Sequence, residues 1–436
     1  MTTLELDDDD NLLIERLPPH LRDRNGIPSE ESRVRMQRAY QLADQALATL
    51  GIEEVIRVSP LGPGWSQDLD VHVRQLPPAA SLERVGWISL DSLLARLGSP
   101  ATNVWCISEA GVPMAAVDLT AEPPPPPVKA VIQRCQRRRQ VRLREVLELR
   151  ALKRNGAQFP PHHEILEVAS RIEAHLGGSL LADELVSEGS PPPVDLSPAR
   201  SLADSVRGRL QPKLVVALSG VDGAGKSSLA QLVSDYLDHV GIRSAIIWTR
   251  PGMRMDWLTR PIVRLLRLFG GPPRIPGVAQ VASGSPIRLR TRRGVVGWLW
   301  TTIVTTVFLA DVRLRHLRSR GVLIYDRHLP DALTTLAFVY AGVDLKLHRW
   351  LVRRLLPPAD LRFYIEMSAE EATARKPGDV IGTHAVTRQL EEYDSILTTV
   401  PAFRRLDGTR TTAELANHVF RAIVGSETLG QAASTD

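Results

Sequence analysis

Residues 213–228 read KLVVALSGVDGAGKSS, and this stretch decides the fold. Its first part, 213–218, is almost wholly apolar, which is typical of a strand buried inside a parallel sheet. The apolar residues of 229–237 then recur at the spacing of one helix face. Gly-x-x-x-x-Gly-Lys-Ser between a strand and a helix is the pattern of a phosphate-binding P-loop. The stretch therefore predicts a P-loop domain.

The residue types of this loop suit phosphate chemistry. Its glycines let backbone N–H groups converge on phosphate oxygens, because they adopt conformations that side chains disfavour. The helix that follows adds the positive end of its dipole. Lys226 would bring a charge to the β- and γ-phosphates of ATP, and the Ser227 hydroxyl would bind Mg²⁺. The expected nucleotide-binding residues are Gly220, Asp222, Gly223, Ala224, Gly225, Lys226, Ser227 and Ser228.

Three further apolar runs predict neighbouring strands, at 244–249, 321–325 and 361–367. The second run ends in Asp326 and Arg327. A carboxylate at a strand end beside the loop is placed to reach Mg²⁺, so Asp326 joins Ser227 as a candidate metal ligand, and Arg327 would face an anionic acceptor. No Asn-Lys-x-Asp sequence follows any strand, so a GTPase is not expected.

Taken in order, these segments resemble thymidylate kinase over roughly residues 205–425. The segments that carry the resemblance are VDGAGKS at 221–227, TRPG at 249–252, DRH at 326–328, PADL at 358–361 and IEMSAEE at 365–371. The sequence is most similar to divergent thymidylate-kinase-like proteins often associated with surface-polysaccharide genes. The resemblance implies a three-layer α/β kinase domain with a parallel sheet. It also implies transfer of the γ-phosphoryl group of ATP, with Mg²⁺, to a nucleoside monophosphate, with dTMP the leading acceptor.

The resemblance also implies roles for single residues. It puts Asp222 against the sugar hydroxyl of the acceptor, and Arg250 and Arg327 beside the acceptor phosphate. Arg375 begins the stretch, up to Arg388, that occupies the position of the family's lid. The catalytic residues implied in this way are Lys226, Asp326, Arg327 and Arg375.

Several positions depart from the family's pattern and leave the acceptor open. Residues 249–252 shorten the usual Thr-Arg-Glu-Pro-Gly-Gly, and His328 replaces a tyrosine. The stretch 375–382 has lost the repeated arginines of the lid, and the insert 253–294 lies where the family shapes its acceptor pocket. A kinase of a sugar or another polysaccharide precursor is therefore one alternative. An ATP-binding regulatory protein with little transferase activity is another.

A second pattern of carboxylates lies near the N-terminus. Asp68 and Asp70 are two residues apart, so they would project from one face of a strand, and Asp118 could approach them from a neighbouring strand. Three carboxylates meeting in this way would hold Mg²⁺ for nucleotidyl transfer. The order helix, strand, turn, Asp-x-Asp resembles the minimal nucleotidyltransferases, although the Gly-Ser element of 64–66 lies closer to the first Asp than in that family. Exposed aspartates on a half-buried sheet, or a non-catalytic relative, are the alternatives.

Breaks in composition divide the chain. The prolines of 123–127 predict an extended spacer, and EGSPPP at 188–193 predicts a second break. Residues 128–154 alternate apolar and basic side chains, which predicts a connecting helix with one solvated basic face. The expected parts are a small α+β nucleotidyltransferase-like domain (1–122), a Pro-rich linker and basic helical connector (123–204), the kinase-like domain (205–425) and a flexible tail (426–436).

Composition narrows the class of protein. A formal net charge of +5 suits anionic ligands such as nucleotides, and no aromatic residues interleave with the arginines of the connector, so no nucleic acid partner is expected. Two cysteines, Cys106 and Cys135, are too few for a disulfide framework and fit the cytoplasm. Val295–Ala310 is apolar but shorter than the roughly 20 residues of a membrane span. It predicts a core helix, with a peripheral membrane contact as the alternative.

Overall fold

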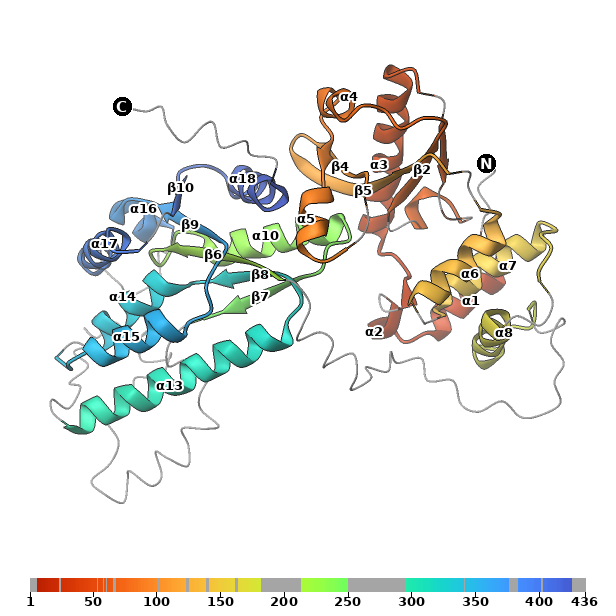
Figure 1. Cartoon of the computed structure of the whole chain (residues 1–436). Coiled ribbons are helices and arrows are strands. Elements are labelled where there is room, and N and C mark those ends of the chain that lie inside the picture. The colour runs from red at the N-terminus through yellow and green to blue at the C-terminus, as the bar shows by residue number, and fades with distance from the viewer. Residues whose placement is uncertain are drawn as a thin grey trace. The chain divides into compact units, whose positions relative to one another are not determined.

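The computed structural model describes residues 6–22, 25–52, 54–57, 59, 61–65, 68–99, 102–122, 125–138, 141–160, 164–181, 213–249, 295–340, 342–375, 383–400 and 403–425. These residues form two compact units, which Figure 1 draws in warm and cool colours. The first consists almost entirely of residues up to 181, and the second of residues from 213 onward. Each unit has its own hydrophobic core.

The N-terminal unit contains a five-stranded mixed sheet of order β1-β2-β5-β4-β3. Its strands are β1 (Glu54–Arg57), β2 (Leu69–Val73), β3 (Ile88–Ser89), β4 (Val104–Glu109) and β5 (Val112–Thr120). β2 and β5 are parallel, and the other pairs are antiparallel. The long helix α3 (Glu30–Thr49) packs on this sheet through Met36, Ala39, Ala43 and Leu47, which share one helix face. The short helices α4 (Ala79–Arg84) and α5 (Asp91–Arg96) lie between β2 and β4 in the sequence, and a 3₁₀ turn, η2 (Pro63–Trp65), precedes β2.

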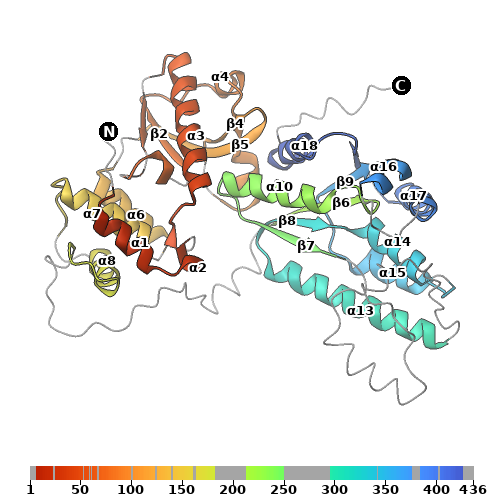
Figure 2. The ribbon, with the colours of Figure 1, turned by 180° about the vertical axis from the view of Figure 1, so that it is seen from behind.

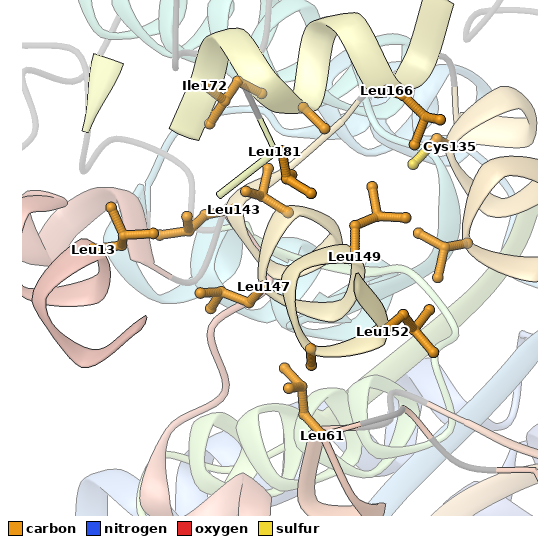
Figure 3. Close-up of a cluster of buried hydrophobic side chains, with 14 of the residues drawn as sticks. Leu13, Leu61, Cys135, Leu143, Leu147, Leu149, Leu152, Leu166, Ile172 and Leu181 are labelled. Carbon is orange, nitrogen blue, oxygen red and sulfur yellow. The ribbon is translucent and has the colours of Figure 1, made fainter. Parts of the chain in front are cut away.

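Helices make up the rest of this unit. They are α1 (Asp8–Arg16), α2 (Pro19–Arg22), α6 (Pro127–Arg138), α7 (Leu143–Arg154) and α8 (Glu164–His175). Figure 3 shows their shared core, in which leucines of α7 meet Leu13 of α1 and Leu166 and Ile172 of α8. α7 is buried along most of its length, because neighbouring helices cover it on several sides. The sequence 128–154 therefore forms two helices, and the prediction of one continuous helix was wrong.

Arg144 and Arg150 of α7 are buried in ion pairs, which corrects the prediction of a solvated basic face. Arg150 donates to Asp10 at 2.6 Å and also pairs with Glu173. Arg144 donates to Glu148 at 3.1 Å, and Arg134 lies 2.6 Å from the other oxygen of that carboxylate. Sequence spacing predicted a basic face because the buried carboxylates that neutralise it come partly from distant helices.

The C-terminal unit is built on a five-stranded sheet of order β10-β9-β6-β8-β7, in which every pairing is parallel. The strands are β6 (Lys213–Gly220), β7 (Ser244–Trp248), β8 (Gly321–Asp326), β9 (Leu361–Glu366) and β10 (Arg404–Asp407). The four strands predicted from apolar runs are present, and the expectation of an α/β unit with a parallel sheet is confirmed. β10 was missed, because its sequence, Arg-Arg-Leu-Asp, has only one apolar residue.

Helices cover both faces of this sheet (Figure 2). One face carries α13 (Val295–Arg318), α14 (Leu329–Val339) and α15 (Lys346–Leu355), which share a core with β6, β7 and β8. The other carries α10 (Lys226–His239) and α18 (Thr412–Val424), whose Tyr236 and Phe420 rings pack edge to face with centroids 6.3 Å apart. α16 (Ala369–Ala374) and α17 (Thr383–Leu397) follow β9 in the chain. The result is a three-layer arrangement with the carboxyl ends of all five strands at one edge.

The apolar segment predicted as a core helix is the first part of α13. One face of the helix is buried, through Trp300, Val304, Phe308 and Val312, which recur every four residues. Its opposite side leaves Leu299 half exposed. In the part of the chain that the structure describes, no helix has the length and apolar character to cross a membrane.

Candidate functional site

The glycine-rich loop 220–227 joins the end of β6, the central strand, to the start of α10. Gly223 has φ +98°, and a Cβ atom added there would lie 2.5 Å from the carbonyl oxygen of Ala372. Gly225 has φ +81°, while the space beside it is open. Both backbone conformations favour glycine, and at Gly223 the close approach of α16 also excludes a larger residue. The glycines at 223 and 225 therefore allow the backbone of the loop to follow its curved path.

Lys226 is the first residue of α10, and its side chain is folded back into the loop. Its Nζ donates to the carbonyl oxygens of Gly220, at 2.6 Å, and Val221, at 2.8 Å. The carboxylate of Asp331 lies 3.9 Å away. Burial lowers the pKa of Lys226, since water no longer surrounds the ammonium group, while Asp331 opposes this effect. The loop thus holds the ammonium group of Lys226 at the place where an anionic ligand would bind.

Asp326, the last residue of β8, lies beside the start of α10. The Ser227 hydroxyl donates to its Oδ2 at 2.5 Å. Its other oxygen, Oδ1, is buried without a hydrogen-bond partner. Buried carboxylate oxygens are usually satisfied, so this one marks a place for a ligand, a metal ion or water. Sequence reasoning named Ser227 and Asp326 as the metal pair, and the fold brings their side chains together.

Arg327 links the end of β8 to the loop. Its guanidinium donates to Asp222 Oδ1 at 2.6 Å, and its Nε is buried without a partner. The residue has φ +84°, a strained value for a side chain of this size. Two bonds hold it there: its N–H donates to Leu218 O at 3.0 Å, and its carbonyl accepts the Thr249 hydroxyl at 2.5 Å. Burial disfavours its charge, but Asp222 and Asp331 outweigh this and raise the pKa of Arg327.

A pocket opens beside this ion pair. It is lined by Asp222, Arg327, Asp331, Thr334, Thr335, Phe338, Gln389 and Tyr393. Phe338 is 42% exposed, and the Thr334 hydroxyl is buried without a partner. The lining therefore offers an apolar ring, hydroxyls, an amide, two carboxylates and a guanidinium to a ligand next to the loop.

Six of these lining residues were missed by sequence reasoning, although a periodic signal was present. Asp331, Thr334, Thr335 and Phe338 fall at positions i, i+3, i+4 and i+7 of the helix that follows Asp326. Gln389 and Tyr393 are likewise four residues apart on α17. A helix that starts at the active edge of a parallel sheet presents one face to that edge, so polar residues at this spacing were the available clue.

Asp331 and Tyr393 tie the pocket to the loop. Asp331 accepts the backbone N–H of His328 at 3.2 Å, and its other oxygen is 2.9 Å from the Tyr393 hydroxyl. The same hydroxyl is 2.9 Å from Gly220 O, so its single proton can serve one of two acceptors at a time. Burial raises the pKa of Tyr393 far above its usual range, and the ring stays neutral. Burial also lowers the pKa of His328 to about 4.

The structure does not bring the remaining predicted arginines that it describes together with the loop. Arg250 lies outside the described residues, as do positions 376–382 of the lid stretch. Arg375 is exposed and donates to the carbonyl of Gly408 at 2.8 Å. Arg388 is exposed on α17. The role of these arginines remains a prediction.

The three N-terminal aspartates do not form the expected metal cluster. Asp70 and Asp118 are register partners on the parallel strands β2 and β5, so they point to the same side of the sheet. Asp68 precedes β2 and acts electrostatically on Arg134. Among the described residues, no three His, Cys, Asp or Glu side chains are grouped closely enough to hold a metal ion. Asp118 lies opposite Asp70 on the neighbouring strand, as expected, but the spacing argument for Asp68 and Asp70 did not foresee that Asp68 lies outside the strand.

Comparison with known proteins gives one match, which covers about half of the chain. A curated protein of Aeropyrum pernix, described as "Putative thymidylate kinase", is 27% identical over 233 residues. The match covers 48% of this chain and 97% of that protein. No family model matches the chain. The parallel sheet of the C-terminal unit fits an α/β kinase-like fold.

Proposed function

We propose that the C-terminal unit transfers the γ-phosphoryl group of ATP to a nucleoside monophosphate, with dTMP as the first acceptor to test. One observation carries the proposal: Asp222 of the loop 220–227 pairs with Arg327, and both line a pocket of the right chemistry for an acceptor. A kinase needs two anionic ligands held side by side, and here a donor-type loop adjoins a second pocket. The thymidylate kinase similarity supports the same reading.

The donor side of the proposal rests on the loop. The backbone N–H groups of the loop and the start of α10 would bind the phosphates of ATP. Lys226 would neutralise charge on the β- and γ-phosphates, because it is the buried cation of this loop. Phosphoryl transfer requires positioning and charge neutralisation, and these residues would provide both.

The residues present also fit Mg²⁺. Oxygen donors are the ligands that this ion prefers, and Ser227 Oγ and Asp326 supply them at the mouth of the loop. The unpartnered Oδ1 of Asp326 is the observation that favours the assignment. When bound, Mg²⁺ would neutralise phosphate charge and orient the phosphoryl group.

On the acceptor side, Phe338 would pack against a ring, and Gln389 would donate or accept at a heteroatom. Arg327 would face the acceptor phosphate, since its Nε lacks a partner. Asp222, held by Arg327, would accept a sugar hydroxyl. A kinase of a sugar or polysaccharide precursor would use the same carboxylates but would not need the guanidinium.

The test is an acceptor panel with the full chain. Purified protein with Mg·ATP would be incubated with nucleoside monophosphates, nucleosides and sugars, and ADP and phosphorylated product would both be measured. Transfer to dTMP that the Lys226→Ala variant abolishes is the expected result. Transfer to a sugar alone would overturn the choice of acceptor. Saturable ATP binding without any transfer would overturn the proposal that the chain is a kinase.

A further inference from the structure

The outward face of α15 combines large apolar side chains with a concentration of positive charge. Trp350 is 59% exposed and Leu347 is 40% exposed. The exposed cations of the helix are Lys346, Arg349, Arg353 and Arg354. None of the ten residues of α15 is Asp or Glu. A solvated helix rarely exposes a tryptophan within such a one-signed field.

The arrangement follows from helix geometry. Successive residues are rotated by about 100°, so Trp350 lies near the middle of the arc that holds the four cations. His348 and Val352, on the opposite side, are fully buried. His348 Nε2 lies 2.9 Å from the Thr302 hydroxyl of α13. α13 therefore covers one side of α15 and leaves the basic, apolar side in solvent.

The start of α13, which contacts α15 at His348, also exposes apolar side chains. Trp298 packs edge to face against His348 with ring centroids 5.7 Å apart. Leu299, the next residue of α13, is 50% exposed, and Leu347, the residue before His348, is exposed too. Val295, one turn before Leu299, is 73% exposed. Both helices lie on the same face of the sheet (Figure 2) and meet at His348.

We propose that this surface, the outward face of α15 with the start of α13, binds an anionic membrane surface, with α15 lying in the plane of the interface. Indole rings are favoured at the boundary between headgroups and acyl chains, where Leu347 and Leu299 would also be buried. Lys and Arg side chains keep their aliphatic stems on the apolar surface while their charges reach anionic headgroups.

Charge argues against a second copy as the occupant, and the apolar side chains argue against a nucleic acid. A second copy placed face to face would bring the arginines of α15 against those of its partner. Nearby acids do not cancel the field: Glu392 lies 3.9 Å from Arg349, and Asp344 precedes the helix. A nucleic acid would attract the cations and stack on Trp350, but it would leave Leu347 and Leu299 without an apolar partner. An anionic lipid surface provides for both kinds of side chain.

The experiment measures co-sedimentation of the full chain with vesicles. One set contains phosphatidylcholine alone, and in the other a third of the lipid is phosphatidylglycerol. Binding is expected to the anionic set only, and it should weaken as NaCl is raised from about 0.1 M to about 0.5 M, because the salt screens the headgroups. Neutralising Arg353 and Arg354 together with serine should weaken partitioning by about 25-fold, at about fivefold per arginine. Trp350→Ser alone should also weaken partitioning, whereas Trp350→Phe should partition nearly as strongly as the native chain.

The matched control is the double variant Arg404→Ser with Arg405→Ser, which removes the same charge from β10, and it should bind as the native chain does. Circular dichroism and thermal unfolding would show that each variant is folded. Equal binding by the α15 and β10 double variants would overturn the proposal. So would binding to single-stranded RNA with no binding to vesicles, or a dimer in solution that Trp350→Ser dissociates.

Discussion

Both units bury arginine and carboxylate side chains together, but the two arrangements differ in how fully their atoms are satisfied. In the helical part of the N-terminal unit, Arg150 donates to both Asp10 and Glu173. In the C-terminal unit, Arg327 pairs with Asp222, yet its Nε and the neighbouring Asp326 Oδ1 are buried without partners. Among the described residues, no buried side-chain atom of α1, α7 or α8 lacks a partner in this way.

The difference separates a structural network from a binding site. Buried charges that satisfy one another stabilise a particular packing, and removing one partner is costly. Buried polar atoms that are left open cost folding free energy, so their concentration at one place calls for a ligand. Thr334 and Ser219 add two more such atoms near the same edge of the sheet. The contrast yields five predictions, which run from the largest expected effect to the smallest.

The largest effect is expected from Lys226→Ala. Removing the buried cation of the loop should lower kcat by about 10³-fold, as loss of a charge at the transferring phosphoryl group does. The melting temperature should stay the same or rise, because burial lowers the pKa of Lys226 and the folded protein therefore bears a cost for its charge. Steady-state kinetics and calorimetry check both parts. Lys129→Ala, on exposed α6 sequence, is the control, and a drop of less than tenfold for Lys226→Ala would contradict the assigned role.

Arg150→Met tests the other side of the comparison. It should lower the free energy of unfolding of the N-terminal unit by about 3–5 kcal/mol, since two buried carboxylates lose their shared partner. Phosphoryl transfer per folded molecule should not change. Urea unfolding followed by circular dichroism measures the first quantity. Arg38→Met, which removes an exposed partner of Glu109, should change stability little, and an equal loss in both variants would refute the distinction.

Much of the fold was predictable because local patterns carried it. The apolar runs at 213–218 and 321–325 predicted β6 and β8, and the glycines of the loop predicted its turn. Fully buried parallel strands leave this trace in sequence, since both of their faces are covered. β10 left no such trace, because only one of its four residues, Leu406, is apolar.

The site was predictable only in part, for a related reason. Asp326 ends β8, and Ser227 follows the loop that leaves the neighbouring strand β6, so topology alone brings them to one edge. Asp331 and Tyr393 are 62 residues apart and lie on different helices, so only packing decides their contact. The buried pairing of α7 was unpredictable on the same ground, since Asp10 is 140 residues from Arg150. The sequence shows which chemical groups each segment carries, whereas tertiary packing decides which of these groups come into contact.

Asp222→Asn tests whether the Arg327–Asp222 pair serves the acceptor pocket rather than the loop. The neutral amide keeps the shape but loses the charge that holds Arg327, so KM for the acceptor should rise about 10- to 100-fold, as expected for a charge-assisted bond. KM for ATP should change little. Initial rates with each substrate varied in turn separate the two. Asp235→Asn, at a partly exposed position of α10, is the control. An equal rise in both KM values would show that Asp222 supports the loop as a whole.

A smaller effect is expected from Tyr393→Phe. The variant removes one buried hydroxyl that lies between Gly220 and Asp331, and a typical hydrogen bond contributes about 1 kcal/mol. We expect about a fivefold loss in kcat/KM, because the loop loses a support from α17. Calorimetry would show a similar small loss of stability. Unchanged kinetics with reduced stability would assign Tyr393 to packing alone.

The smallest effect is a dependence on pH in the buried network of α7. Burial works against the charge of Glu148, but Arg144 and Arg134 outweigh it, so the pKa of Glu148 is lowered from its usual 4.5. A lowered pKa in the folded state means stability that is present above the unfolded pKa and is lost as pH falls through the folded one. The native chain should therefore exceed Glu148→Gln in unfolding free energy at pH 7, and the gap should narrow below about pH 4.5. Burial raises the pKa of Asp10, so the pH profile of the native chain combines opposite effects. The difference between the native chain and Glu148→Gln isolates the contribution of Glu148. Urea titrations at several pH values give the gap directly, and a gap that stays constant to pH 3 would show that Arg144 and Arg134 do not hold this carboxylate in its charged form.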